Sequence, residues 1–262
     1  MNFIRVLYSS GVQPNALILA WYNSLAVKTS NALTTALNTL SQGLFDDGDW
    51  AKLDLFGLVG GMETQEQRLR PLVTTSGDDF VINGAPVLNA NGFNPNASGG
   101  YLDLKWNPTT DGVQYTLNSA FISSYCHNDD IAYSNVMLGS ADSLGAQSAY
   151  PLRNGTVLSG IINNDGSALV PTIDNGVTSY YTAVVLNGGN ITLHKNAVTN
   201  AAAFASPQLP IYDFYGGELN IEDVAGGFGG IMTLRHFMAG AGTANQTQIQ
   251  ARLNTFYASR GL

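Results

Sequence analysis

The chain has 262 residues, of which 45% are hydrophobic, so it is long enough to bury a substantial core. Only 11% of the residues are charged, and 19 acidic side chains against 11 basic ones give a formal net charge of −8. This balance argues against a basic face for nucleic acid, and no apolar run reaches the length of about 18 residues that a membrane span requires. The 29 glycines and the many asparagines favour turns between short strands.

Helical patterns occupy the N-terminal region. Pro14 suits the first turn of a helix, and apolar residues then recur at helical spacing. A second helix is predicted from an N-cap at Thr29 or Ser30 to a stop at Gly43. Because most of its other positions are weak helix formers, its apolar stripe must be buried on the body of the protein, on a neighbouring subunit or on a larger assembly.

Charge changes sharply along the chain, because residues 1–45 contain no acidic side chain. We therefore expect residues 1–43 to form a helical assembly or anchoring segment. Residues 44–262 are expected to form a β-sandwich domain that ends in a helix.

Three acidic residues, Asp46, Asp47 and Asp49, come just after this boundary. They predict a short helical turn through Leu55, whose positive end would attract them. Clustered carboxylates also suit calcium, but the twelve-residue spacing of a calcium loop is absent. Capping is therefore preferred, and calcium binding at Asp46–Asp49 stays open.

Short apolar runs separated by Gly, Asn, Asp and Pro begin near residue 68, and they predict an antiparallel sandwich or barrel. The expected strands are Phe80–Ile82, Tyr101–Lys105, Tyr115–Tyr125, Ala132–Leu138, Val157–Ile162, Tyr180–Leu186, Ile191–Lys195, Pro210–Gly216 and Gly229–Met238. A capping-box pattern at Thr243 and Gln246 then predicts a C-terminal amphipathic helix, with Gly261 as its terminal cap.

Signatures of catalysis are sparse. The sequence contains no nucleophile elbow, phosphate-binding loop or HExxH motif. Cys126 and His127 are adjacent on an expected strand, so their side chains point to opposite faces and cannot pair easily. Asp103 has no second acid on the same face of its strand, whereas glycoside hydrolysis needs two carboxylates across a cleft. These patterns predict a protein that is not an enzyme, with no catalytic residue, metal ligand or cofactor.

A carbohydrate-binding surface is better supported, because sugars are recognised by aromatic faces and short polar side chains, and the predicted turns contain Tyr and Asn. Each such residue also has an ordinary explanation in turn chemistry or sheet packing. The candidate glycan contacts are Asn128, Asp129, Asp174 and Tyr180.

Several segments, taken in order, resemble those of one known protein family. Asp49–Asp54 followed by Gly57–Gly61 resembles the family's opening, a short W-x-K-L-D helix and a glycine-ended segment before a concanavalin-like, laminin-G-like jelly roll. The resemblance covers residues 44–262, although Arg260-Gly261 inverts the family's usual Gly-Arg ending. Further matching segments are Asn91-Gly92-Phe93, Tyr101–Leu104, Trp106-Asn107-Pro108, Ile191–Asn196, Leu209–Gly216 and Ile231–Gly261. Together these segments resemble a family of bacteriophage particle proteins.

This resemblance implies a non-catalytic virion structural protein that displays a lectin-like, concanavalin-like jelly-roll sandwich on the particle surface, as a capsid decoration, head fibre or tail appendage. Such a protein is expected to be a homo-oligomer that contacts other virion proteins through residues 1–43. The alternative is a receptor-binding lectin that recognises polysaccharide of the host surface. A polysaccharide-degrading enzyme on the same fold is the less favoured third hypothesis.

Overall fold

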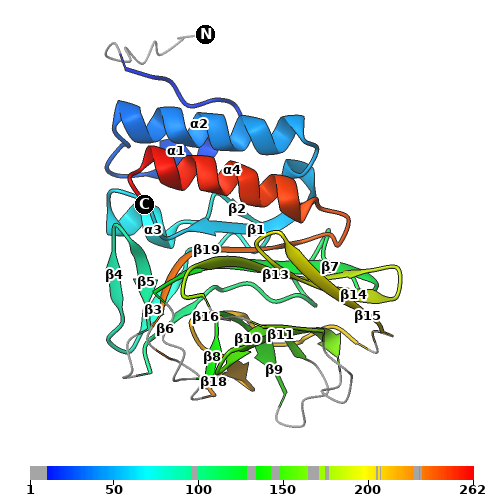
Figure 1. The fold of residues 1–262 in the computed structure, drawn as a ribbon. Helices are drawn as coiled ribbons and strands as arrows, with labels where there is room; N and C mark the ends of the chain where they lie inside the picture. Colours follow the sequence, from blue (N-terminus) through cyan, green and yellow to red (C-terminus); the bar gives the residue numbers. More distant parts are fainter. Residues whose placement is uncertain are drawn as a thin grey trace.

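A computed structural model describes residues 11–95, 99–128, 134–142, 148–164, 171–174, 177–204, 206, 208–226, 230 and 232–262. This part of the chain forms two facing β-sheets, with helices covering the outer face of one of them (Figure 1). Among the described strands, all pairs are antiparallel except the pair of β17 with β9. The expected fold class, a mainly β antiparallel sandwich with N-terminal helices and a C-terminal helix, is confirmed.

The sheet beneath the helices has the order β15-β14-β13-β7-β19-β1-β2, and β5 pairs with β19 and with β4. Its central strands are buried along nearly their whole length because helices cover one face and the second sheet covers the other. Its strands are β1 (Leu53–Leu58), β2 (Val73–Thr74), β4 (Val87–Asn89), β5 (Gly92–Asn94), β7 (Ser119–His127), β13 (Tyr180–Asn187), β14 (Asn190–Lys195), β15 (Val198–Ala203) and β19 (Thr233–Gly240).

The second sheet has the order β12-β11-β10-β9-β16-β6-β3, with β8, β17 and β18 paired beside this path. Its strands are β3 (Val81–Asn83), β6 (Tyr101–Asp103), β8 (Ser134–Val136), β9 (Leu138–Ala141), β10 (Ser148–Asn154), β11 (Val157–Asn164), β12 (Thr172–Asp174), β16 (Tyr215–Gly216), β17 (Asn220–Ile221) and β18 (Val224–Ala225).

The main core lies between the two sheets. Its largest side chain, Trp106, is fully buried and meets the rings of Tyr115 and Phe214 edge to face, at centroid distances of 5.6 and 5.3 Å. Such aromatic contacts add to the burial of apolar area, which is the main stabilising contribution of a core. The single cysteine, Cys126, is buried in this core as a thiol.

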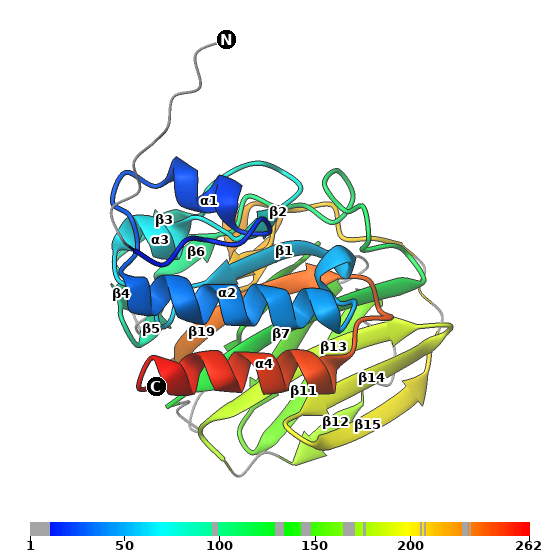
Figure 2. The same cartoon turned by 90° about the horizontal axis from the view of Figure 1, so that it is seen from above.

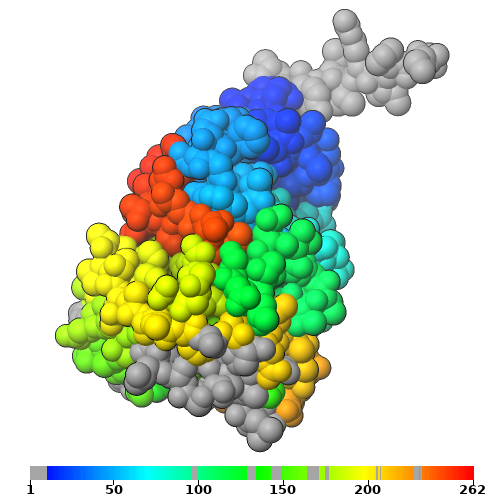
Figure 3. Space-filling model, turned by 90° about the vertical axis from the view of Figure 1, so that its right-hand side faces the viewer, coloured from blue at the N-terminus to red at the C-terminus, as the bar shows by residue number. Residues whose placement is uncertain are grey.

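A second core lies between the first sheet and the helices α1 (Leu19–Ser24), α2 (Asn31–Asp46) and α4 (Gln246–Ser259). Helices α2 and α4 lie side by side across the sheet (Figure 2). In the space-filling view, the N-terminal helices and the C-terminal helix form one continuous cap over the sandwich (Figure 3). None of the described helices is both long and apolar enough to cross a bilayer.

The apolar stripe of α2 is buried within this chain. The expected N-cap is confirmed at Ser30, whose side chain accepts a hydrogen bond from the backbone N–H of Leu33. Leu33, Leu37, Leu40 and Leu44 are at most 2% exposed and pack into the second core. The opposite face of α2 is exposed at Thr35, Thr39 and Gln42, and the division of the chain at residue 43 stays a prediction.

The acidic stretch Asp46–Asp49 overlaps the end of α2 and is followed by only a short helical turn. Helix α2 continues beyond Gly43 to Asp46, and after a short 3-10 turn at Trp50–Lys52 the chain enters β1 at Leu53. The predicted helical turn is therefore present at Trp50–Lys52, but its predicted extension through Leu55 is wrong because residues 53–55 belong to β1. β1 lacks alternation because both of its faces are buried, so its apolar run resembles a helix segment in the sequence.

The N-terminus of α4 also differs from the expected capping box. The cap is Asn245, whose side-chain oxygen accepts a hydrogen bond from the backbone N–H of Gln248 at 3.3 Å. Gln246 instead accepts a hydrogen bond from the buried Tyr181 hydroxyl at 2.6 Å. At the other end, Gly261 adopts a φ of 73°, as expected of a residue that terminates a helix.

Candidate functional site

The polar residues on one edge of the first sheet surround a cleft of about 380 Å³. Its walls come from the β4–β5 hairpin, the end of β7, the start of β19 and the residues after α4. In Figure 1 the hairpin and the C-terminal end of α4 meet on the same side of the molecule. The side chains that give the cleft its chemistry are Asn89, Asn91, Asn94, His127, Asn128, Thr233 and Arg235.

The hairpin is held against β19 by a close backbone approach at Gly92. This glycine has a φ of 140°, and a Cβ on it would lie 2.2 Å from the backbone oxygen of Leu234. Phe93 is the register partner of Leu234 and anchors the hairpin in the main core. At the tip, the side chain of Asn89 accepts a hydrogen bond from the backbone N–H of Asn91 at 2.9 Å, an Asx turn that orients the asparagines.

A β-bulge in β19 positions Arg235. Leu234 pairs with Cys126 and Phe237 pairs with Ser124, so Arg235 and the following residue together oppose Tyr125. A bulge turns consecutive side chains away from strict alternation, and bulges are common beside functional sites. The backbone oxygen of Arg235 accepts the N–H groups of Val59 and Gly60, at 3.0 and 2.9 Å, which fixes the bulge against the end of β1.

The guanidinium of Arg235 contacts aromatic rings in place of a carboxylate. Its central carbon lies 5.2 Å from the centre of the Tyr125 ring and 5.5 Å from that of Tyr257. The residue is 5% exposed, and its Nε has no hydrogen-bond partner. Gly60 gives the side chain room, because a Cβ there would lie 2.9 Å from Cγ of Arg235. A cation–π pair attracts the charge but leaves the N–H donors without a strong acceptor.

His127 supplies a neutral ring beside this charge. Partial burial lowers the pKa of His127, and the nearby positive charge of Arg235 lowers it further. The ring is therefore uncharged at neutral pH, with Nδ1 hydrogen-bonded to the hydroxyl of Ser179 at 2.9 Å. The next residue, Asn128, has a φ of 53° and an exposed side chain at the mouth of the cleft.

The four predicted glycan contacts do not form one site. Asn128 lines the cleft, and Asp129 lies outside the described residues. Asp174 is exposed at the end of the edge strand β12, where its backbone oxygen accepts a hydrogen bond from Lys195 at 2.8 Å. Tyr180 is 0% exposed in the main core, so its proposed contact with a glycan is corrected: no face of its ring reaches solvent.

Sequence reasoning missed Arg235, Thr233 and the asparagines of the hairpin as site residues. A signal was present, because Arg235-His236 interrupts an otherwise apolar strand and two consecutive polar residues break the alternation of a regular strand. Their convergence with the hairpin depends on strand register, which spacing along the chain does not reveal.

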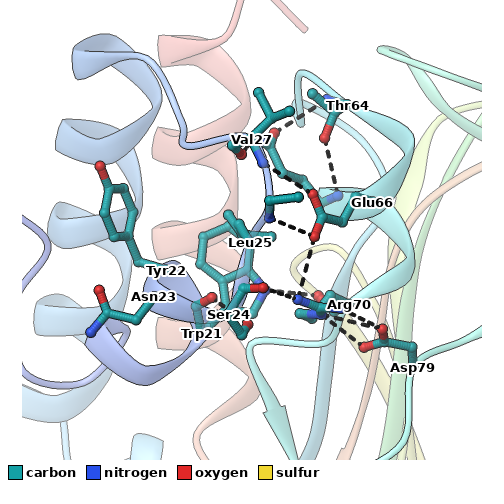
Figure 4. Close-up of polar contacts among 12 residues, drawn as sticks. Trp21, Tyr22, Asn23, Ser24, Leu25, Val27, Thr64, Glu66, Arg70 and Asp79 are labelled. Atoms are coloured by element: carbon teal, nitrogen blue, oxygen red, sulfur yellow. Dashed lines mark hydrogen bonds and ion pairs between the residues drawn. The ribbon is translucent and has the colours of Figure 1, made fainter.

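A second hollow, of about 710 Å³, lies beside α1 but has a structural explanation. Figure 4 shows Arg70 reaching from the end of α3 (Gln65–Leu69) to the carboxylate of Asp79 and to the backbone oxygen of Ser24, at 2.9 and 2.6 Å. Asp79 raises the pKa of Arg70, and the backbone N–H of Ala26 lowers that of Glu66. These charges are satisfied within the chain and hold α1 in place.

The acidic residues Asp46, Asp47 and Asp49 are also used separately. Asp47 pairs with Arg252 at 2.8 Å, and Asp49 is fully buried and pairs with Lys52 at 2.9 Å. Within the described ranges, no group of three or more His, Cys, Asp or Glu side chains is arranged to hold a metal ion.

Two carboxyl groups from different segments, those of Asp103 and Asp213, interact electrostatically. The pattern of a single strand does not reveal such a pair. Asp103 on β6 is ion-paired with Lys105 at 2.6 Å. Burial raises the pKa of Asp213, the negative charge of Asp103 raises it further, and Lys105 opposes the shift. A carboxyl group with a raised pKa near a second carboxyl group is an arrangement that catalysis can use, although structural pairs show it too.

No family model and no curated protein matches this chain. Solved structures share its fold. A mutant of Trypanosoma rangeli sialidase displaying trans-sialidase activity matches with a TM-score of 0.54 and 11% identity, over 87% of this chain and 40% of its own. The binding domain of botulinum neurotoxin DC in complex with SialylT matches with a TM-score of 0.54 and 13% identity, over 79% and 51%.

A third structure is of botulinum neurotoxin type C, whose cell entry is described as dependent upon interaction with two ganglioside molecules. It matches with a TM-score of 0.53 and 13% identity, over 78% of this chain and 51% of its own. The chain thus spans about 40% of the sialidase chain and about half of the toxin chains.

The prediction that the protein is not an enzyme is corrected by these structures. Several are sialidases, including a complex with sialic acid, so this fold occurs within enzyme chains and gives no ground for excluding catalysis. At 11–13% identity the likeness is one of fold. The chain is a β-sandwich of a fold that occurs in sialidase chains and in toxin binding domains.

Proposed function

We propose that this protein binds carbohydrate, in the cleft between the β4–β5 hairpin and the start of β19. The observation that carries the proposal is the lining of that cleft. Asn91 and Asn128 present exposed amides, Thr233 adds a hydroxyl, and His127 adds a neutral imidazole. Amides and hydroxyls both donate and accept hydrogen bonds, as the hydroxyl groups of a sugar require. The volume of about 380 Å³ lies within the usual range for small-ligand sites, about 300–1,000 Å³.

The fold supports the same proposal. Structures that share it are described as complexes with SialylT and with sialic acid, and one concerns interaction with gangliosides. The low charge of the chain also suits a surface that meets neutral hydroxyl groups, since only 11% of its residues are charged.

We further propose that the protein acts on the surface of a bacteriophage particle and recognises polysaccharide of the host. The support is the order of motifs across residues 44–262, which resembles that of phage particle proteins with a lectin-like jelly roll. In this proposal residues 1–43 carry the contacts with other virion proteins or with further copies of the chain. The exposed face of α2 suits such contacts because Thr35, Thr39 and Gln42 are uncharged.

Binding to immobilised surface polysaccharide from a susceptible host tests the first proposal. Thr233→Val removes a hydroxyl from the cleft with little change of shape, and Asn128→Gly removes an amide while tolerating the positive φ. Both variants should weaken binding at least about fivefold, whereas Thr199→Val, on the exposed edge strand β15, should leave it unchanged. Equal binding by all four proteins would reject the cleft as the site.

Immunogold labelling of intact particles with an antibody against residues 46–262 tests the second proposal. Label over the capsid would indicate a decoration protein or head fibre, and label at the tail tip would indicate a receptor-binding role. Particles without label, from a stock in which the protein is found only in solution, would contradict the assignment to the virion.

A further inference from the structure

We propose that the cleft selects saccharides that carry a carboxylate, such as hexuronic or sialic acid residues, and that Arg235 binds this carboxylate. The inference rests on the proposed carbohydrate binding and specifies its substrate class. It begins from a charge that the fold buries at the wall of the cleft and does not neutralise.

Ion pairing separates Arg235 from three other arginines. Arg70, Arg252 and Arg260 each lie within 3.4 Å of a carboxylate oxygen. In the described part of the chain no carboxylate pairs with Arg235, although the residue is 5% exposed and its Nε is buried without a hydrogen-bond partner. A buried cation without a counter-ion is costly, so an anion that enters the cleft gains an unusually favourable partner.

The composition of the cleft strengthens this contrast. The protein has 19 acidic residues and a formal net charge of −8, yet the described lining of the cleft includes no Asp or Glu. Burial lowers the pKa of the His127 ring, and the positive charge of Arg235 lowers it further. Among the described residues that line the cleft, Arg235 carries the one charged side chain, so a ligand carboxylate that enters meets a cation and no Asp or Glu side chain of that lining.

The side chain is also held in place before a ligand arrives. The bulge is anchored by the hydrogen bonds from Val59 and Gly60 to the backbone oxygen of Arg235, and Tyr125 and Tyr257 contact the guanidinium. A guanidinium presents several N–H donors in a rigid fork that matches the two oxygens of a carboxylate. An anchored fork loses little conformational entropy on binding, which favours affinity.

The neighbouring groups indicate that the carboxylate belongs to a sugar. Thr233 lies two residues before Arg235 on β19, and Asn91 and Asn128 stand on the opposite walls contributed by the hairpin and by the end of β7. These neutral groups can form hydrogen bonds with the hydroxyl groups of the sugar ring while Arg235 binds its carboxylate. A simple carboxylate such as acetate would leave them unused and should bind weakly.

The test compares matched ligands on the whole 262-residue protein by isothermal titration calorimetry. One pair is an oligoglucuronate and its carboxyl-reduced, neutral form; the other is sialyllactose and lactose. Wild-type protein should bind at least one of the two acids about tenfold more tightly than its neutral partner, and the difference should shrink as salt is raised. The pair that shows the preference distinguishes a uronic acid from a sialic acid.

Arg235→Gln should abolish the preference, and Arg235→Lys, which keeps the charge but loses the fork, should retain only part of it. Thr199→Val is the control that should leave it intact. Circular dichroism and thermal unfolding check that each variant folds. If Arg235→Gln does not fold, the comparison of acidic and neutral ligands on the wild-type protein still tests carboxylate selection.

Three outcomes would overturn the inference. Equal affinity for acidic and neutral partners would reject carboxylate selection while leaving carbohydrate binding in place. Tighter binding of sulfated than of carboxylated oligosaccharides would reject the carboxylate as the selected group. Failure to bind these ligands and also the host polysaccharide would reject the carbohydrate-binding function itself, and the inference with it.

Discussion

The guanidinium carbon of Arg235 lies 5.2 Å from the centre of the Tyr125 ring, and the two residues face each other across a bulge between β19 and β7. This relationship connects the fold to the cleft. The bulge takes Arg235 out of the regular alternation of its strand, and the ring holds the cation where no carboxylate of the described chain neutralises it.

Replacing Gly92 by alanine should damage the cleft more than the sandwich. The new Cβ would lie 2.2 Å from the backbone oxygen of Leu234, so the hairpin must move away from β19. We expect a loss of at least about 2 kcal/mol in the free energy of unfolding and a loss of saccharide binding.

Gly188→Ala is the matched control, because Gly188 also has a positive φ, 58°, but has open space around its Cβ position. It should cost about 1–2 kcal/mol and leave binding intact. Equal losses of unfolding free energy and equal saccharide binding in the two variants would show that the position of the hairpin does not determine the shape of the cleft.

The helical layer should contribute strongly to stability. Leu37 is 1% exposed in the second core, so Leu37→Ala should lower the free energy of unfolding by about 2–5 kcal/mol in chemical denaturation. Thr35→Ala, on the exposed face of the same helix, should change it by less than about 0.5 kcal/mol. A small effect of Leu37→Ala would mean that α2 is a weakly attached appendage.

Buried His236 should make stability depend on pH. Burial lowers the pKa of His236 to about 3, whereas an unfolded histidine titrates near 6.5. The unfolded chain therefore binds the proton first as pH falls, so the contribution is complete above pH 6.5 and is lost progressively between about 6.5 and 3.

The slope due to His236 approaches about 1.4 kcal/mol per pH unit within this window. His236→Asn keeps an amide that can hydrogen-bond the Tyr257 hydroxyl, which now lies 3.0 Å from Nδ1, and removes the titration. Urea denaturation of both proteins between pH 7.5 and 5 should give a steeper loss for the wild type. Parallel curves would show that this imidazole does not titrate on unfolding.

Local chemistry predicted several elements of the fold correctly. Ser30 caps α2, strands occur in the order that the turn signals indicate, and a C-terminal helix is followed by Gly261 with a positive φ. Strand β1 was missed because its burial on both faces removes alternation. β15 was missed because it is an exposed edge strand of small and polar residues, whose place is set by pairing with β14.

Prediction of the cleft was poorer than prediction of the fold. Asn128, a candidate from turn chemistry, lines the cleft, and its contact with a glycan stays a prediction. Tyr180 faces the core because its strand lies in the middle of the first sheet. Arg235 was missed because the cleft depends on the register of β19 with β7 and β5. Strand β19 lies more than 100 residues after both of these strands in the sequence. Pairing at that distance along the chain has no local signature.

Hydrogen–deuterium exchange with and without ligand tests the central claim most directly, that the cleft binds saccharide. The whole protein would be saturated with oligosaccharides released from the surface polysaccharide of a susceptible host. The account predicts slower exchange at residues 87–94 and 232–236, and unchanged exchange at residues 171–174 on the distant edge strand β12. Protection confined to other segments, or no protection at ligand saturation, would contradict it.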